Sequence, residues 1–228
     1  MSLFPRFAAA LGSLVIATGA VQAAPVTIAT LFNTGVDASG QPLANGTVPD
    51  PHYRLVTVPT GSSMNTRVID PSGGFPIGPY FVGSNLSRWI VANNPESGGG
   101  AGDNSPMGTY VFRTTFDLTG YDFTTASITG GWVSDNNGID ILINGTSLNF
   151  TNPGNFGVGF TSFAVSSGFV AGINTLDFKV NNASGTTGNP VALRVEMTGT
   201  ANAVPTPASL ALVMVAGMAA LGASRRRT

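Results

Sequence analysis

The chain has 228 residues, only 9% of which are charged, and it contains no cysteine and one histidine. This composition excludes thiol chemistry, cysteine-based metal sites and histidine-rich metal sites. Between residues 24 and 203, six basic side chains stand against eleven acidic ones, a formal charge of about −5. That balance argues against nucleic-acid binding, which depends on clustered Lys and Arg.

The first 23 residues have the three parts of a secretory signal peptide. Arg6 is the single early charge, an apolar stretch follows at 7–16, and the small residue Val21 precedes a cleavage site between Ala23 and Ala24. An N-terminal membrane anchor is the alternative, but its apolar core would be short for a bilayer span of about twenty residues. We therefore predict an N-terminal signal helix followed by one folded domain at 24–203.

Short apolar runs of period-two alternation fill this domain, and turn residues such as Asn and Gly separate them. No run has a helix-length period of 3.6 residues. Many short strands with Gly/Asn turns predict an all-β fold, an antiparallel β-sandwich of jelly-roll type. Longer loops are expected at 33–50 and 93–108. The predicted strands are 26–33, 53–58, 88–93, 109–118, 126–134, 138–145, 160–170, 174–182 and 192–199.

In four runs the alternation assigns each side chain to a buried or a solvent-exposed face. The residues assigned to buried faces are Tyr110, Phe112, Thr114, Phe116, Leu118, Ile139, Ile141, Ile143, Leu176, Phe178, Val180, Leu193, Val195 and Met197. Those assigned to exposed faces are Arg113, Thr115, Asp117, Asp140, Asn144, Asp177, Lys179, Arg194 and Glu196.

The densest polar cluster follows Trp132. Asp135, Asn136 and Asn137 lie between two predicted strands, and Gly138 would permit a tight turn. One interpretation is a simple hairpin turn, because Asp, Asn and Gly are ordinary turn residues. A second is a ligand site, in which these side chains bind sugar hydroxyls and Trp132 offers an aromatic face.

A weaker third interpretation is a calcium site, with oxygen ligands from Asp135, Asn137 and Asp140. The spacing is incomplete against a calcium loop, which needs more carboxylates and a distal glutamate. Trp89 and Trp132 could stack on a sugar, although a tryptophan in a strand of a small sandwich more often belongs to the core.

The sequence offers no convincing catalytic set. His52 is expected to be a surface residue before a strand, and no serine lies in a Gly-x-Ser-x-Gly elbow. Asp117 and Asp177 are the candidates for a glycosidase carboxylate pair, but the default for both is solvated sheet surface. We therefore expect a non-enzymatic protein without a cofactor.

The chain ends in a proline triplet, an apolar run of about sixteen residues at 208–223 and an arginine cluster. This tail resembles the PEP-CTERM sorting signal of Gram-negative exopolysaccharide producers, with threonine where the family has the glutamate of its triplet. The resemblance implies a transmembrane-type helix, recognised and cut near the triplet by an exosortase, a membrane enzyme. The matching sorting residues are Pro205, Thr206, Pro207, Arg225, Arg226 and Arg227.

The domain also resembles a galactose-binding-like sandwich that is often found with such tails. The likeness covers residues 87–201 and implies a fold subtype, without an activity. It is carried by the segments SRWIV (87–91), GTYVFRTTFDLTG (108–120), ASITGGWVSDNNGIDILING (126–145), GFVAGINTLDFKVNN (168–182) and NPVALRVEMTGTA (189–201).

Together these patterns predict an exported, non-enzymatic protein of the cell surface or extracellular matrix. Its tail would hold it briefly in the inner membrane with the arginines on the cytoplasmic side, before exosortase processing, and its role would be linked to exopolysaccharide or biofilm. A carbohydrate-binding module for a surface or matrix glycan is the alternative. A hydrolase is a third hypothesis, for which no acid pair or nucleophile is found.

Overall fold

The computed structural model describes residues 23–69, 80–92, 105–183 and 189–204. Within these residues the protein is all-β, with two antiparallel sheets and no helix. The predicted signal helix and the sorting tail, including Pro205, Thr206, Pro207 and the three arginines, lie outside the described residues. Of the predicted cleavage site, Ala23 and Ala24 are the first described residues.

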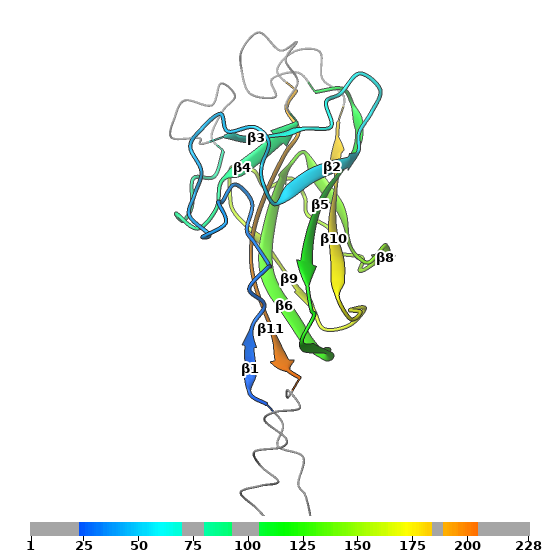
Figure 1. Ribbon diagram of the computed structural model, residues 1–228. Coiled ribbons are helices and arrows are strands. Elements are labelled where there is room, and N and C mark those ends of the chain that lie inside the picture. The colour runs from blue at the N-terminus through cyan, green and yellow to red at the C-terminus, as the bar shows by residue number, and fades with distance from the viewer. Residues whose placement is uncertain (1–22, 70–79, 93–104, 184–188, 205–228) are drawn as a thin grey trace, which may run out of the picture.

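The larger sheet has six strands in the order β3-β4-β11-β6-β9, and β1 pairs with the far end of β11 (Figure 1). The first and last strands therefore lie side by side, with Pro25 opposite Asn202. The bounds are β1 (Pro25–Thr27), β3 (Thr66–Ile69), β4 (Trp89–Ala92), β6 (Tyr121–Asp135), β9 (Thr161–Val165) and β11 (Ala192–Ala203).

The smaller sheet has five strands in the order β2-β5-β10-β7-β8. Its long central pair, β5 and β10, is in register from Gly108 opposite Asn182 to Asp117 opposite Ile173. The bounds are β2 (Tyr53–Thr57), β5 (Gly108–Asp117), β7 (Asn137–Ile143), β8 (Thr146–Ser147) and β10 (Ile173–Asn182).

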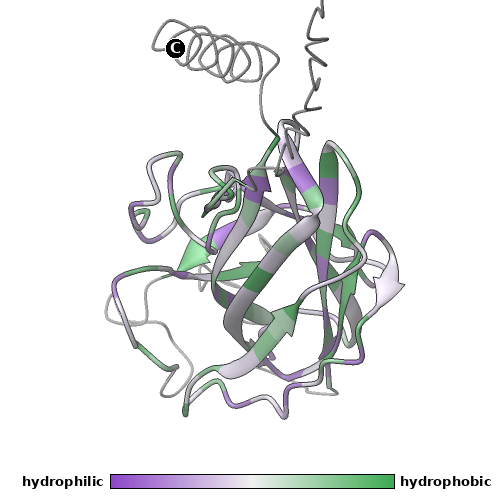
Figure 2. Ribbon diagram, turned by 90° about the horizontal axis from the view of Figure 1, so that it is seen from below, coloured by the Kyte–Doolittle hydropathy of each residue, from purple (hydrophilic) through white to green (hydrophobic). Residues whose placement is uncertain are grey.

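The main hydrophobic core lies between the two sheets. The Phe178 ring from β10 meets Trp132 of β6 and Phe163 of β9, with ring centroids 5.8 and 5.9 Å apart. Apolar and polar residues alternate along the strands, so that the apolar ones face this core. Figure 2 shows the alternation as successive green and white or purple bands on the strands. Burial of such large apolar side chains is the principal force that holds the sheets together.

The buried faces were predicted correctly with one exception. The predicted inward residues of β5, β10 and β11 are all buried, as are Ile141 and Ile143 of β7. Ile139 is 37% exposed instead, because the pairing of β7 with β10 shifts between Lys179 and Val180 and leaves Ile139 as the extra residue. A bulge of this kind reverses the side-chain alternation from that point.

The exposed faces were predicted less well, because a second hydrophobic cluster covers the outer side of the six-stranded sheet. The segment before β4 carries Tyr80 and Phe81 onto this side, beside Trp89. Arg194, predicted to be exposed, lies beneath this segment and is 1% exposed. The other members of the cluster are Ile69, Val91, Val133, Phe156, Phe160 and Ala192.

Several strand boundaries also differ from prediction. The strand expected at 26–33 ends at Thr27, and the one expected at 160–170 ends at Val165. β6 begins at Tyr121, five residues before the predicted start, and the short strands β3 and β8 were not predicted. The expected loop at 33–50 contains no strand, only an isolated bridge between Val36 and Pro42.

Candidate functional site

The predicted site at Asp135–Asn137 is the link between the two sheets. Asp135 ends β6 and is paired with Ala192 of the six-stranded sheet, whereas Asn137 begins β7 and is paired with Asn181 of the five-stranded sheet. The peptide bond between Asp135 and Asn136 is cis. The hairpin interpretation is therefore wrong, because β6 and β7 do not pair with each other.

Asp135 is a buried, hydrogen-bonded carboxyl group. The residue is only 4% exposed, and its Oδ2 accepts a hydrogen bond from the Tyr80 hydroxyl at 2.5 Å. Oδ1 accepts one from the side-chain amide of Asn136 at 2.9 Å. Burial raises the pKa of Asp135 to about 6, although the Tyr80 hydrogen bond acts in the opposite direction. The group thus ties the link to Tyr80 and leaves little capacity for a ligand.

This carboxyl group makes the stability of the fold depend on pH. Because its folded pKa of about 6 lies above the ordinary value of 3.8, its contribution is full below pH 4 and is lost as the pH rises through 6. We expect the free energy of unfolding to fall by about 2–3 kcal/mol from this group between pH 4 and pH 7. Urea unfolding of the protein and of Asp135→Asn across this range would measure it. Parallel pH profiles of the two proteins would contradict the expectation.

The two asparagines of the link differ in availability. Asn136 is committed to structure, since its Oδ1 accepts the backbone N–H of Ala183 at 2.7 Å and its carbonyl accepts the Ser134 hydroxyl at 2.9 Å. Asn137 is exposed, and its side chain makes no hydrogen bond to the described residues. Of the predicted polar contacts, Asn137 alone is free to meet a ligand.

A hollow of about 340 Å³ lies beside Asn137. The Asn152 amide in its wall is committed, because it donates to the Trp132 carbonyl at 2.8 Å and accepts the Gly154 N–H at 2.8 Å. Asn137 and Thr151 remain as polar groups, next to the half-exposed Ile139. The lining residues are Asn137, Gly138, Ile139, Thr151, Asn152 and Pro153.

Trp132 offers no face to a sugar, which corrects the aromatic part of the ligand hypothesis. The residue is 0% exposed and packs between Phe178 and the backbone of Gly138. Trp89 is also 0% exposed, and its indole N–H donates to the Phe81 carbonyl at 2.9 Å. Both tryptophans therefore belong to hydrophobic clusters.

The calcium candidates are not gathered into a cation site. Both carboxyl oxygens of Asp135 already accept hydrogen bonds within the protein, from Tyr80 and from Asn136. Asp140 Oδ1 accepts the backbone N–H of Asn149 at 2.9 Å. Within the described ranges, no group of three or more His, Asp or Glu side chains is placed to hold a metal ion.

The catalytic candidates are likewise committed to structural contacts. Asp177 is buried and forms a bidentate ion pair with Arg113, at 2.6 and 2.7 Å, which corrects the expectation of a solvated carboxylate. Asp117 lies on the neighbouring strand β5, four residues after Arg113, and hydrogen bonds from Thr119 lower its pKa. The His52 ring stacks on Phe32 at 3.7 Å, and its Nε2 lies 3.1 Å from the Asp37 carbonyl oxygen.

Two arrangements were not predicted from the sequence. The buried Arg194 could not be recognised, because nothing in the sequence shows which segment covers its strand. The second arrangement is the grouping of Arg54 with Arg113 and Lys179 on one side of the five-stranded sheet, which the sequence indicates in part. Period-two alternation places each of these side chains on the outer face of its own strand. The sequence does not show that the three strands are neighbours, so the grouping could not be predicted.

Comparison with protein-family models and with curated proteins found no match to this chain. In the part of the chain that the structure describes, no helix is long and apolar enough to cross a membrane.

Proposed function

We propose that this protein is an exported, non-enzymatic component of the cell surface or extracellular matrix, sorted by an exosortase-type membrane enzyme. The observation that carries the proposal is the order of the proline triplet, the apolar run at 208–223 and the arginine cluster in the sequence. The domain is proposed to be a jelly-roll sandwich of the galactose-binding-like type. Two packed antiparallel sheets agree with it, and the commitment of Asp117, Asp177 and His52 to structural contacts supports a role without catalysis.

The pairing of β1 with the end of β11 supports a tethered arrangement. Both ends of the folded part leave from the same end of the molecule (Figure 1). A domain held there by its C-terminal segment would present its opposite end and its sheet faces to the surroundings. In this proposal the tail is a transient inner-membrane anchor, and the processed protein associates with exopolysaccharide.

Cell fractionation combined with intact-mass measurement tests the sorting proposal. We expect surface or released material to lack residues 1–23 and the arginine cluster. The variant Thr206→Glu, which restores the family triplet, should be processed at least as completely, whereas replacing Arg225, Arg226 and Arg227 together by serine should reduce retention and cutting. Mature, surface-exposed protein that keeps the three arginines would overturn the proposal.

A carbohydrate-binding module is the second candidate function. The exposed Asn137 amide and the Thr151 hydroxyl beside the hollow of about 340 Å³ favour it, because amides and hydroxyls exchange hydrogen bonds with sugar hydroxyls. Since Trp132 is buried, any such contact is made without aromatic stacking from that residue.

A further inference from the structure

The two sheets differ in what covers their outer sides. The segment that includes Tyr80 and Phe81 covers the six-stranded sheet, whereas basic side chains stand on the outer side of the five-stranded sheet. We call Arg54, Arg113 and Lys179 the cationic face. It holds three of the six basic residues of a domain whose formal charge is about −5. Two acidic residues lie among them, Asp177 opposite Arg113 and Asp140 opposite Lys179, so the face carries a small net positive charge.

Strand register fixes the arrangement of this face. Arg54 of β2 is directly opposite Arg113 of β5, which is opposite Asp177 of β10. Lys179 lies two residues beyond Asp177 on the same side of β10. From the ordinary spacing of strands and residues, the backbones at Arg54 and Lys179 are roughly 12 Å apart.

The charges on this face are only partly neutralised within the protein. Asp177 is taken up by its bidentate pair with Arg113, which also fixes the Arg113 side chain in place. Neither Arg54 nor Lys179 forms an ion pair or side-chain hydrogen bond with any of the described residues. Like charges directly opposite on neighbouring strands are unfavourable. An anion beside Arg54 and Arg113 would relieve that repulsion.

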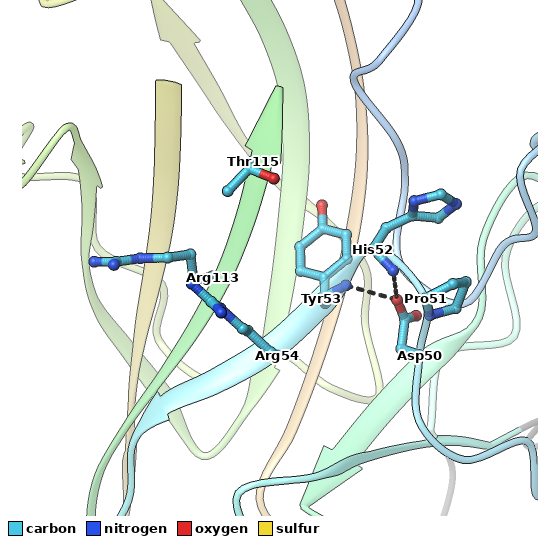
Figure 3. Close-up of a pocket in the computed structure, with 7 residues that line it drawn as sticks. All are labelled: Asp50, Pro51, His52, Tyr53, Arg54, Arg113 and Thr115. Atoms are coloured by element: carbon cyan, nitrogen blue, oxygen red, sulfur yellow. Dashed lines mark hydrogen bonds between the residues drawn. The ribbon is translucent and has the colours of Figure 1, made fainter. Parts of the chain in front are cut away.

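A hollow of about 260 Å³ lies where Arg54 and Arg113 meet (Figure 3). Figure 3 shows Arg54 directed from β2 toward Arg113, with the Thr115 side chain above them and the His52 ring turned away. The Thr115 hydroxyl is exposed and has no partner among the described residues. The hollow therefore offers a free guanidinium group and a free hydroxyl, which together can bind a carboxylate and a neighbouring sugar hydroxyl.

The wall of this hollow is rigidly built. The buried Asp50 carboxylate accepts backbone N–H groups from Gly35 at 2.6 Å and from His52 and Tyr53 at 2.8 Å each. These bonds hold the start of β2 against the loop at 33–50. Arg54 is therefore presented from a fixed backbone, which lowers the entropy lost on binding.

The geometry points to the cationic face as a binding site for a carboxylate-bearing polysaccharide, with one acidic sugar at Arg54 and Thr115 and another at Lys179. No exposed aromatic ring lines the hollow among the described residues, so ion pairs must supply the affinity that stacking gives on neutral glycans. Three cations on an acidic domain are too few for nucleic acid, whose binding uses many phosphate contacts. The inference rests on the proposed function in taking a matrix polysaccharide as the partner.

Isothermal titration of the full-length chain in mild detergent with polygalacturonate tests this site, and carboxyl-reduced polygalacturonate serves as the neutral control. We expect binding that weakens with salt, no binding of the reduced polymer, and at least tenfold weaker binding for Arg54→Gln and for Lys179→Gln. Thr198→Glu, at an exposed position of the six-stranded sheet, makes the same change in net charge and should alter affinity less than twofold.

Three results would overturn the inference. They are equal affinity of Arg54→Gln and the unmodified protein, equal binding of the carboxyl-reduced polymer, and equally tight binding of duplex DNA. Loss of binding in Asn137→Ala, with retention in Arg54→Gln, would place the sugar site at the Asn137 hollow instead. These measurements are independent of tail processing, so failure of this site and failure of the sorting proposal give separate results.

Discussion

Replacement of Arg194 by methionine is expected to lower the free energy of unfolding by about 3–5 kcal/mol, although it exchanges a buried charge for an apolar side chain of similar length. Exchange of a buried charged side chain for an apolar one is well tolerated where the groups that it bonds are replaced by apolar groups as well. Here the partners would remain, and the carbonyls of Val82 and Ser84 accept a hydrogen bond from no other described donor. Each buried carbonyl left without a hydrogen bond costs about 1–3 kcal/mol.

The surroundings of Arg194 explain the size of this effect. Its guanidinium donates to the Ser84 carbonyl at 2.7 Å, to the Ser87 hydroxyl at 2.6 Å and to the carbonyls of Phe81 and Val82. The rings of Phe81 and Phe160, which contact each other edge to face, have centroids 5.7 and 5.5 Å from its central carbon. One side chain thus fastens residues 81–87 to the outer side of the six-stranded sheet.

Urea unfolding of Arg194→Met would measure the change, with Arg54→Met as the matched control. Arg54 is exposed and makes no contact that the fold requires, so its loss should change stability by less than about 0.5 kcal/mol. Arg194→Lys should be intermediate, because a single ammonium group cannot reach all the carbonyls. A loss below about 1 kcal/mol for Arg194→Met would show that other contacts hold the segment.

Substitution of Gly138 by alanine is expected to cost about 3 kcal/mol. Gly138 does not need a special backbone angle; it is glycine because the Trp132 ring lies directly on its backbone. A Cβ atom at this position would be 2.1 Å from Cη2 and 2.4 Å from Cζ3 of the indole. The ring cannot withdraw, since it is 0% exposed and packed against Phe178. Overpacking of a closed core costs about 1–3 kcal/mol and occasionally more.

A double-mutant cycle separates this clash from a backbone effect. Trp132→Phe removes the atoms nearest to the new methyl group, so Gly138→Ala should be much less harmful in its presence, with a coupling energy of about 1 kcal/mol or more. The four unfolding free energies give the result directly. Additive effects of the two substitutions would contradict the proposed contact.

Much of the local structure could be read from the sequence, because strands with one buried face have a strict period of two. The inward residues of β5 and β10 were predicted in full for this reason. Ile139 escaped the rule because a bulge is a property of a strand pair, and the partner of β7 was not known. The Asp135–Asn137 link has the composition of a turn, yet the sheet to which each neighbouring strand belongs decides that it crosses between layers.

The sequence indicated where the polar residues of the candidate site lie, but not which of them are available to a ligand. Asn137 and the hollow beside it agree with the ligand hypothesis, whereas Trp132, Asp135 and Asn136 proved to be structural groups. Asp177 and Arg194 alternate with core residues as exposed side chains do, but a cross-strand partner buries one and an overlying segment buries the other. Side-chain period shows which face a residue is on and cannot show whether that face is covered.

By itself, the sequence determined the all-β class and the inward faces of β5, β10 and β11, because these follow from local alternation and composition. Only the tertiary structure decided which sheet each strand joins, that Arg194 is buried, and that Arg54, Arg113 and Lys179 share one side of a sheet. The physical reason is that strand pairing and the covering of a sheet face depend on contacts between residues far apart in the chain. Arg194 and Ser84 are separated by 110 positions.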